Sequence, residues 1–289
     1  MTCNLTIDVW RDDDGQGRRV LGHAQHQLDV SFSELGQDLW VAELFPSQTG
    51  FWLEIGAWSA FQLSNTVVLE ERGWTGISVK PFPQEGSFEA RVGSGYAGCH
   101  KLVTAVVLGD ERDTVFAGSA GGNSRVCGGV IDFHLEEGES RPSDYYLTAG
   151  GTRAELVSVK SRTAHSILQE YLKESGPCMI HYMSLDSEGS EIDILQTFPF
   201  HHYLVASLTV EAQDGRVKRD QLTTLMDSKG FIQSTRSIGR DVFFLNVLLF
   251  DNLQVKPGSG NLRFSESNLP DLGYLPVPAC KLKDPSGYS

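Results

Sequence analysis

Hydrophobic residues in this chain fall into short continuous runs, separated by stretches in which apolar residues recur with helical spacing. The runs that we expect to be strands are 51–56, 76–79, 102–108, 180–185, 204–210, 231–235 and 241–250. The stretches with helical spacing are 33–45, 61–72, 164–172, 191–195 and 217–228. Strands that alternate with helix-length segments predict βαβ units. We therefore expect an α/β, Rossmann-like fold with a mainly parallel central sheet, helices on both faces and a terminal antiparallel strand.

The segments outside this pattern define the expected domain organisation. Residues 1–30 are polar and charged, and we expect an N-terminal extension with a short strand near its start. Residues 31–250 form the main domain, in which clustered glycines over 109–151 predict an insertion of loops and hairpins. This insertion has no GxGxxG or GxxxxGK pattern that would predict phosphate binding. Residues 251–289 form a tail that we expect to run over the surface or to pack on a partner protein.

The first helix is expected to be amphipathic. Its apolar positions recur over 33–45, and Ser33 stands where an N-cap residue is expected.

Composition excludes several classes of function. The formal net charge of −13 disfavours binding to nucleic acid and to anionic membrane surfaces. No apolar run approaches the roughly 20 residues that span a bilayer. The five cysteines are far apart and form no CxxC pair, which predicts reduced thiols: Cys3, Cys99, Cys127, Cys178 and Cys280. We therefore expect a soluble protein of a reducing compartment, either the cytoplasm or an organelle interior.

Polar and small residues follow four of the expected strands. These are the segments 54–57, 80–81, 186–189 and 211–213. Ligands of an open parallel sheet bind outside the carboxyl ends of its strands, so we expect the four segments to meet there. Gly56 suits a tight turn in which the backbone approaches a ligand closely. The histidines have no metal-ligand spacing, and no metal is required, although Asp186 and Glu188 could hold one.

Five stretches, in this order, carry a family resemblance. They are Ser33-Glu-Leu-Gly-Gln-Asp-Leu39, residues 51–66, residues 73–77, Leu185-Asp-Ser-Glu-Gly-Ser-Glu191 and Leu208-Thr-Val-Glu211. The first resembles an entry helix that often reads S-Q-x-G-E-D, and the fourth is close to a D-x-E-G-x-E signature. Together they resemble the FkbM-type methyltransferases over about residues 31–246.

The resemblance implies a class I methyltransferase fold that binds S-adenosylmethionine. It further implies methyl transfer to a hydroxyl oxygen of a small molecule or a glycan. The cofactor-binding residues that it implies are Glu54, Gly56, Ala57, Asn65, Lys80 and Asp186.

The same resemblance gives the candidate catalytic carboxylates Asp186, Glu188 and Glu211. A carboxylate at this place could orient an acceptor hydroxyl or act as a general base. Alternatively, Asp186 and Glu188 cap the helix that starts near Gly189, because carboxylates are favoured at the positive end of a helix.

Three positions depart from the family pattern. Ala60 replaces a glycine of the cofactor loop, behind Trp58, whose indole could fill the pocket or stack on a ligand. Lys80 stands where an acidic residue usually accepts hydrogen bonds from both ribose hydroxyls, and each lost charge-assisted bond is worth roughly 1.5–3 kcal/mol. Ala212 replaces a histidine after the fifth strand.

These departures leave alternatives open. The chain is an active methyltransferase, or it is a catalytically degenerate subunit that binds protein partners through its terminal extensions within a larger complex. A third interpretation is a different, phosphorylated nucleotide ligand bound through Lys80.

Overall fold

The computed structural model describes most of the chain. The described residues are 8–11, 17–23, 26–46, 49–57, 61, 63–81, 100–118, 125–127, 145–147, 153–173, 177–212, 216–234, 237, 239–247 and 277–283.

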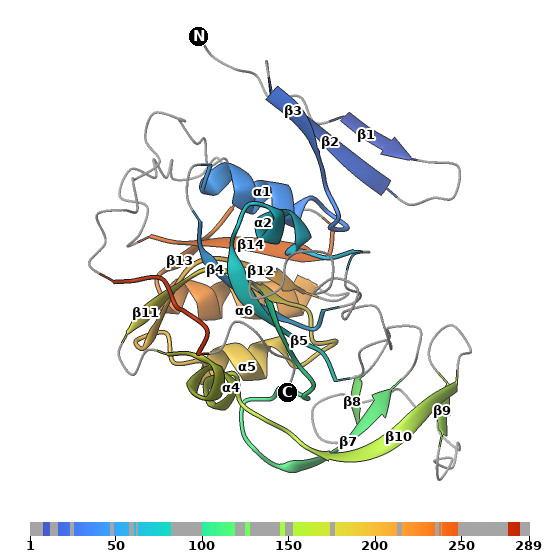
Figure 1. Ribbon diagram of the computed structural model, residues 1–289. Helices are drawn as coiled ribbons and strands as arrows, with labels where there is room; N and C mark the ends of the chain where they lie inside the picture. Colours follow the sequence, from blue (N-terminus) through green and yellow to red (C-terminus); the bar gives the residue numbers. More distant parts are fainter. Residues whose placement is uncertain are drawn as a thin grey trace.

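A seven-stranded sheet forms the centre of the molecule (Figure 1). In spatial order its strands are β6 (His100–Val103), β5 (Thr75–Val79), β4 (Phe51–Ile55), β11 (Cys178–Leu185), β12 (Tyr203–Glu211), β14 (Asp241–Asn246) and β13 (Phe231–Gln233). The strands from β6 to β12 are parallel, whereas β14 is antiparallel to both of its neighbours. Numbered along the chain, the order is 3-2-1-4-5-7-6, which is the Rossmann order with one antiparallel strand inserted. The mainly parallel sheet is thus confirmed and is consistent with a Rossmann-like fold.

Helices cover both faces of this sheet. They are α1 (Gln37–Leu44) and α2 (Val67–Glu71) on one face, and α4 (Ala164–Tyr171), α5 (Glu191–Thr197) and α6 (Arg216–Ser228) on the other. Successive strand residues point to opposite faces, so Trp52 packs beneath α1 and α2, while Phe51 and Leu53 join the opposite core. Among the described helices, none combines the length and the apolar character needed to cross a bilayer.

Two smaller antiparallel sheets flank the centre. One contains β1 (Asp8–Arg11), β2 (Gly17–His23) and β3 (His26–Val30), and the other contains β8 (Arg125–Cys127), β7 (Asp113–Gly118), β10 (Arg153–Lys160) and β9 (Tyr145–Leu147). The second sheet lies largely within the expected insertion, and β10 completes it from just beyond residue 151.

Helix α1 differs from the expected amphipathic helix over 33–45. It starts at Gln37, preceded by Gly36 in the left-handed conformation with φ of 79°. Ser33 is not the N-cap residue, because Gly36 holds that position; the Ser33 hydroxyl donates to the buried carboxylate of Asp38 at 2.7 Å and accepts the Asp38 N–H at 3.5 Å. Nearly all of its side chains are buried, since α2 and the segment before α1 cover the side that the sheet does not. The predicted N-cap and one-sided burial are therefore wrong.

Helix α2 is shorter than the pattern over 61–72 predicts. The backbone N–H of Asn65 donates to Glu54 Oε1 at 3.2 Å, and the Thr66 hydroxyl donates to Glu54 Oε2 at 3.1 Å. These bonds to a strand hold the segment in a turn, so the helix begins only at Val67.

The described part of the tail, 277–283, packs against its own domain. Isolated bridges join Met179 to Ala279 and Leu172 to Leu282. This stretch therefore corrects the expectation that the tail only crosses the surface or binds a partner.

A disulfide joins Cys178 to Cys280 across 102 positions of sequence. The expectation of reduced thiols is wrong for these two residues. The two cysteines are brought together because the tail pairs with β11. The spacing of cysteines along the sequence does not reveal such a long-range contact.

His181 is a buried histidine of β11 that contacts β4 and the aromatic residues Phe45 and Trp74. Its ring centroid lies 5.5 Å from that of Trp74 and 5.6 Å from that of Phe45, and its Nδ1 accepts the Phe51 N–H at 3.2 Å. Burial lowers the pKa of His181 to about 4. Gly50 passes beside these rings, where a Cβ would lie 2.8 Å from the His181 and Trp74 rings, so a larger residue does not fit.

Loss of the disulfide should destabilise the domain. We expect Cys178→Ser, Cys280→Ser and the double variant to lose a similar 2–4 kcal/mol or so of unfolding free energy, because each opens the same long loop. Urea denaturation measures this loss, and mass spectrometry of an unreduced digest should find the two cysteine peptides linked. Separate thiol peptides from the folded protein would contradict the assignment.

His181 should make stability depend on pH. Its pKa is 6.5 in the unfolded chain and about 4 in the fold, so the unfolded chain binds more protons between these values. The stabilisation is present above pH 6.5 and is lost as the pH falls toward 4, by at most roughly 3 kcal/mol. Urea denaturation across this range should show a weaker pH dependence for His181→Gln, whereas the exposed control His201→Gln keeps that of the wild type. Equal slopes in the two variants would refute this role.

Candidate functional site

The carboxyl ends of three parallel strands meet at Gly56. Its N–H donates to the carbonyl of Val79 at the end of β5 at 2.9 Å, and the Asp186 N–H donates to the carbonyl of Ile55 at 2.9 Å. Gly56 has a φ of +91°, and a Cβ there would overlap the backbone carbonyl of Asp186. Only glycine lets β4 and β11 approach this closely at the switch point of the sheet.

Glu54 is a buried carboxylate that connects neighbouring elements. Besides the turn at Asn65 and Thr66, it accepts the Ser78 hydroxyl of β5 at 2.7 Å. The Asn65 side chain in turn donates to the Ser184 hydroxyl of β11 at 2.8 Å. Glu54 and Asn65 thus order the turn beside the first strand, and their direct contact with a cofactor stays a prediction.

Lys80 lies at the end of β5 and is half-buried. Its ammonium donates to the carbonyl of Ala57 at 2.8 Å. Burial lowers the pKa of Lys80, while the negative charges of Glu54 and Asp186 oppose that effect. The lysine therefore supplies a positive charge close to two acidic residues of the candidate site.

Glu191 organises the loop that follows β11. Its Oε1 accepts the N–H groups of Ser187 at 3.0 Å and Gly189 at 2.9 Å, and its Oε2 lies 2.6 Å from the Lys218 ammonium of α6. Glu191 is fully buried, so this paired charge fixes the loop.

The bonds of Glu191 bear on the helix-cap interpretation of Asp186 and Glu188. In this loop the N–H groups of Ser187 and Gly189 donate to Glu191. Ser190 is the residue before α5 and makes no side-chain cap bond. Both interpretations of Asp186 and Glu188, as helix caps and as site carboxylates, therefore stay predictions.

The three candidate catalytic carboxylates come together. Asp186, Glu188 and Glu211 each offer an oxygen, and these oxygens all lie within 4.8 Å of one another. They arise from the end of β11, from the loop behind it and from the end of β12. The convergence that the sequence predicts for these strand ends is therefore found.

The crowding of carboxylates changes the pKa of Asp186. Burial, and then the charge of Glu211 and the hydrogen bond between the two carboxyls, raise the pKa of Asp186 well above its ordinary value. Glu188 and Glu191 add to the same effect. Part of Asp186 nevertheless stays open to solvent, so a ligand can reach it.

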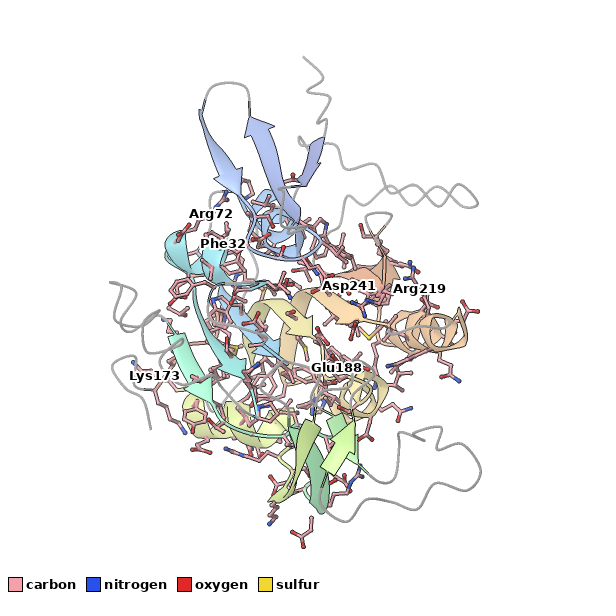
Figure 2. All side chains as sticks on the ribbon, turned by 90° about the vertical axis from the view of Figure 1, so that its right-hand side faces the viewer. Phe32, Arg72, Lys173, Glu188, Arg219 and Asp241 are labelled. Atoms are coloured by element: carbon pink, nitrogen blue, oxygen red, sulfur yellow. A yellow bond between two sulfur atoms is a disulfide. The ribbon has the colours of Figure 1, made fainter. Side chains whose placement is uncertain are left out.

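Two further charged residues adjoin the cluster from β14 and the turn before it. Arg240 lies 3.4 Å from Glu211 Oε1. Asp241 pairs with Glu211 in the sheet, and burial raises its pKa to about 6, although Gln37 donates to its Oδ2 at 2.6 Å. Figure 2 shows Asp241 above Glu188 near the middle of the view.

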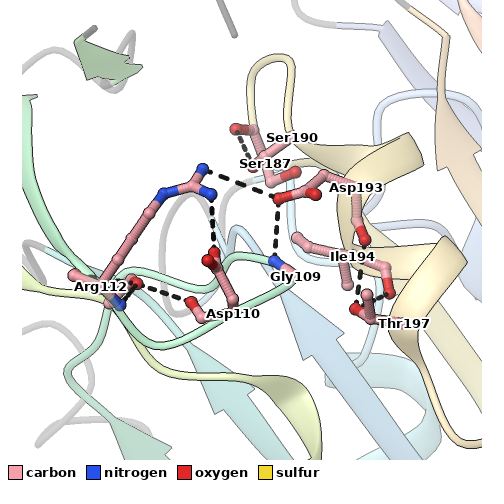
Figure 3. Close-up of polar contacts among 9 residues, drawn as sticks. Gly109, Asp110, Arg112, Ser187, Ser190, Asp193, Ile194 and Thr197 are labelled. Carbon is pink, nitrogen blue, oxygen red and sulfur yellow. Dashed lines mark hydrogen bonds and ion pairs between the residues drawn. The ribbon is translucent and has the colours of Figure 1, made fainter. Parts of the chain in front are cut away.

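The insertion sheet is connected to the same region through Asp193 of α5 (Figure 3). Asp193 Oδ2 accepts the Gly109 N–H at 2.9 Å and lies 3.9 Å from the Arg112 guanidinium. Figure 3 also shows the Ser190 hydroxyl bonded to the Ser187 carbonyl, at 3.4 Å, within the loop that carries Glu188.

Two residues of the expected cofactor loop, Trp58 and Ala60, lie outside the described residues, so their predicted places stay untested. Ala212 is buried, and its N–H donates to the carbonyl of Arg240 at 2.9 Å.

Two residues of this site, Glu191 and Asp241, are not among the candidates that the sequence predicts. For Glu191 a signal was available, because this residue closes the D-x-E-G-x-E signature.

The close approach at Gly56 predicts a large cost for its replacement. We expect Gly56→Ala to lose clearly more unfolding free energy than Gly230→Ala in urea denaturation. Both glycines have a positive φ, which costs alanine about 1–2 kcal/mol, but a Cβ at Gly230 would meet no atom within 4 Å. Similar losses in the two variants would show that the carbonyl of Asp186 does not constrain this turn.

Comparison of the chain with protein-family models, with curated proteins and with solved structures found no match.

Proposed function

We propose that this protein transfers a methyl group from S-adenosylmethionine to a hydroxyl oxygen of a small molecule or glycan. The observation that carries the proposal is the meeting of Gly56, Lys80, Asp186 and Glu211 at the carboxyl edge of the parallel sheet. This edge lies beside the switch point between β4 and β11, where Rossmann-like sheets bind nucleotides. The resemblance to FkbM-type methyltransferases supplies the cofactor and the reaction.

The carboxylates suit the chemistry of the acceptor. In the transfer, the acceptor oxygen bonds to the methyl carbon as the carbon–sulfur bond breaks, and S-adenosylhomocysteine leaves. The hydroxyl proton must pass to a base, and Asp186 is the most exposed of the three carboxylates. Glu191 acts on the reaction only by positioning the loop.

A second candidate function is favoured by Lys80. Its ammonium already donates to the carbonyl of Ala57, and it cannot accept hydrogen bonds from ribose hydroxyls. This arrangement supports a catalytically degenerate methyltransferase-fold subunit that serves assembly in a larger complex.

The disulfide bears on the compartment in which the protein works. Disulfides persist in oxidising compartments and are rare in the cytosol. We therefore propose that the protein resides in an oxidising compartment, in place of the reducing one that the cysteine spacing predicts.

Calorimetry with S-adenosylhomocysteine tests the function. We expect the wild-type protein to bind it with a micromolar Kd. Lys80→Glu should bind about tenfold more tightly, because one restored charge-assisted bond is worth at least roughly 1.5 kcal/mol. The matched control is Lys229→Glu, which makes the same charge change at an exposed site after α6 and should bind as the wild type does.

The other outcomes decide between the candidates. No binding to the wild type at millimolar ligand, with binding recovered in Lys80→Glu, would establish the degenerate subunit. No binding to either protein would overturn the adenosyl site altogether.

A further inference from the structure

Three acidic side chains gather at the carboxyl edge of the sheet, near the positive charges of Lys80 and Arg240. Asp186, Glu188 and Glu211 bring three carboxylates within 4.8 Å of one another. Lys80 shares its charge between Asp186 and Glu54, and Arg240 lies near both Glu211 and Glu34. Three carboxylates this close repel one another unless a proton or a cation lies among them.

A second observation comes from Glu211 itself. This residue is only 7% exposed, and its Oε2 is buried without a hydrogen-bond partner among the described residues. A buried oxygen without a donor costs roughly 1–3 kcal/mol, and more when it is charged. Glu211 also contributes a carboxylate oxygen to the cluster, and a cation bound by this carboxylate would offer it the partner that Oε2 lacks among the described residues.

The spacing of the oxygens suits a metal ion. Two oxygens that each lie about 2.1–2.4 Å from one ion can be at most about 4.2–4.8 Å apart, and the three oxygens already lie within 4.8 Å. Carboxylate oxygens select hard divalent cations such as Mg²⁺, Mn²⁺ and Ca²⁺.

The surrounding structure holds the oxygens in place. One oxygen of Glu191 accepts N–H groups of the loop, and the other lies beside the Lys218 ammonium. These contacts fix the backbone around Glu188. Glu211 is fixed at the end of β12 by its pairing with β14. Three ligands from rigid elements leave the remaining coordination positions to water or to a substrate oxygen.

We propose that Asp186, Glu188 and Glu211 bind one hard divalent cation at the carboxyl edge of the sheet. Binding of the ion stands on these residues alone. A role in catalysis rests on the proposed function, in which the ion would coordinate the acceptor hydroxyl beside the methyl donor and make it easier to deprotonate.

Titration of the chelator-treated full chain with Mn²⁺, followed by electron paramagnetic resonance, tests the site. We expect one saturable site per chain with a sub-millimolar Kd, from which Mg²⁺ or Ca²⁺ displaces Mn²⁺. Glu188→Gln and Asp186→Asn should each weaken binding at least tenfold. Asp227→Asn, which removes an exposed carboxylate of α6, should leave the affinity unchanged.

Several results would overturn the site. These are the absence of saturable binding up to about 1 mM, or equal affinity in Glu188→Gln and Asp227→Asn, which would show only scattered surface binding. Glu188 is half-buried, so Glu188→Gln keeps the test valid if a variant at the more buried Glu211 fails to fold.

The metal site and the proposed function can fail separately. Binding of S-adenosylhomocysteine without binding of Mn²⁺ would refute only the metal site. Binding of Mn²⁺ without binding of S-adenosylhomocysteine would refute only the methyltransferase proposal.

Discussion

The close contact between the backbones of β4 and β11 at Gly56 is the constraint on which the rest of the site depends. Because no side chain separates Gly56 from the Asp186 carbonyl, the first and fourth strands of the parallel series end side by side. Each residue after those ends is thereby placed at one edge: Ala57 and the Lys80 that bonds to it on one side, and the loop from Asp186 on the other. A wider turn would place Lys80 farther from Asp186, and the attraction between these two charges would weaken with the distance.

The acidic residues of this edge have distinct roles because they have distinct neighbours. Glu54 and Glu191 are buried, but their oxygens receive hydroxyl, N–H or ammonium donors, so both act as structural connectors. Asp186 and Glu211 lie beside each other and beside Glu188, and a proton or a cation among them relieves the repulsion that Lys80 and Arg240 offset in part. Residue type alone does not separate the two groups, whereas the donors around each carboxylate do.

The sequence was informative where the signal is local and repeated. Period and glycine placement predicted the strands of the sheet, its parallel direction and the meeting of the strand ends at Gly56 and Asp186. The starts of α1 and α2 were not predictable in this way, because they depend on side-chain bonds: Ser33 to the buried carboxylate of Asp38, and the Asn65 N–H to Glu54. The Cys178–Cys280 pair and the approach of Asp241 to Glu211 depend on contacts between segments far apart in the chain, which no spacing encodes.

Lys80 has two opposing effects on the same site. As a donor in the place of an acidic residue, it removes the acceptors that ribose hydroxyls would use. As a positive charge near Asp186, it also lowers the cost of gathering carboxylates at the strand ends. An acidic residue at this position would favour the ribose but would add a further negative charge beside Glu54 and Asp186. Lys80 therefore does more than remove a ligand contact. The number of carboxylates that can gather at the strand ends depends on the charge of the residue at the end of β5, and Lys80 favours the cluster.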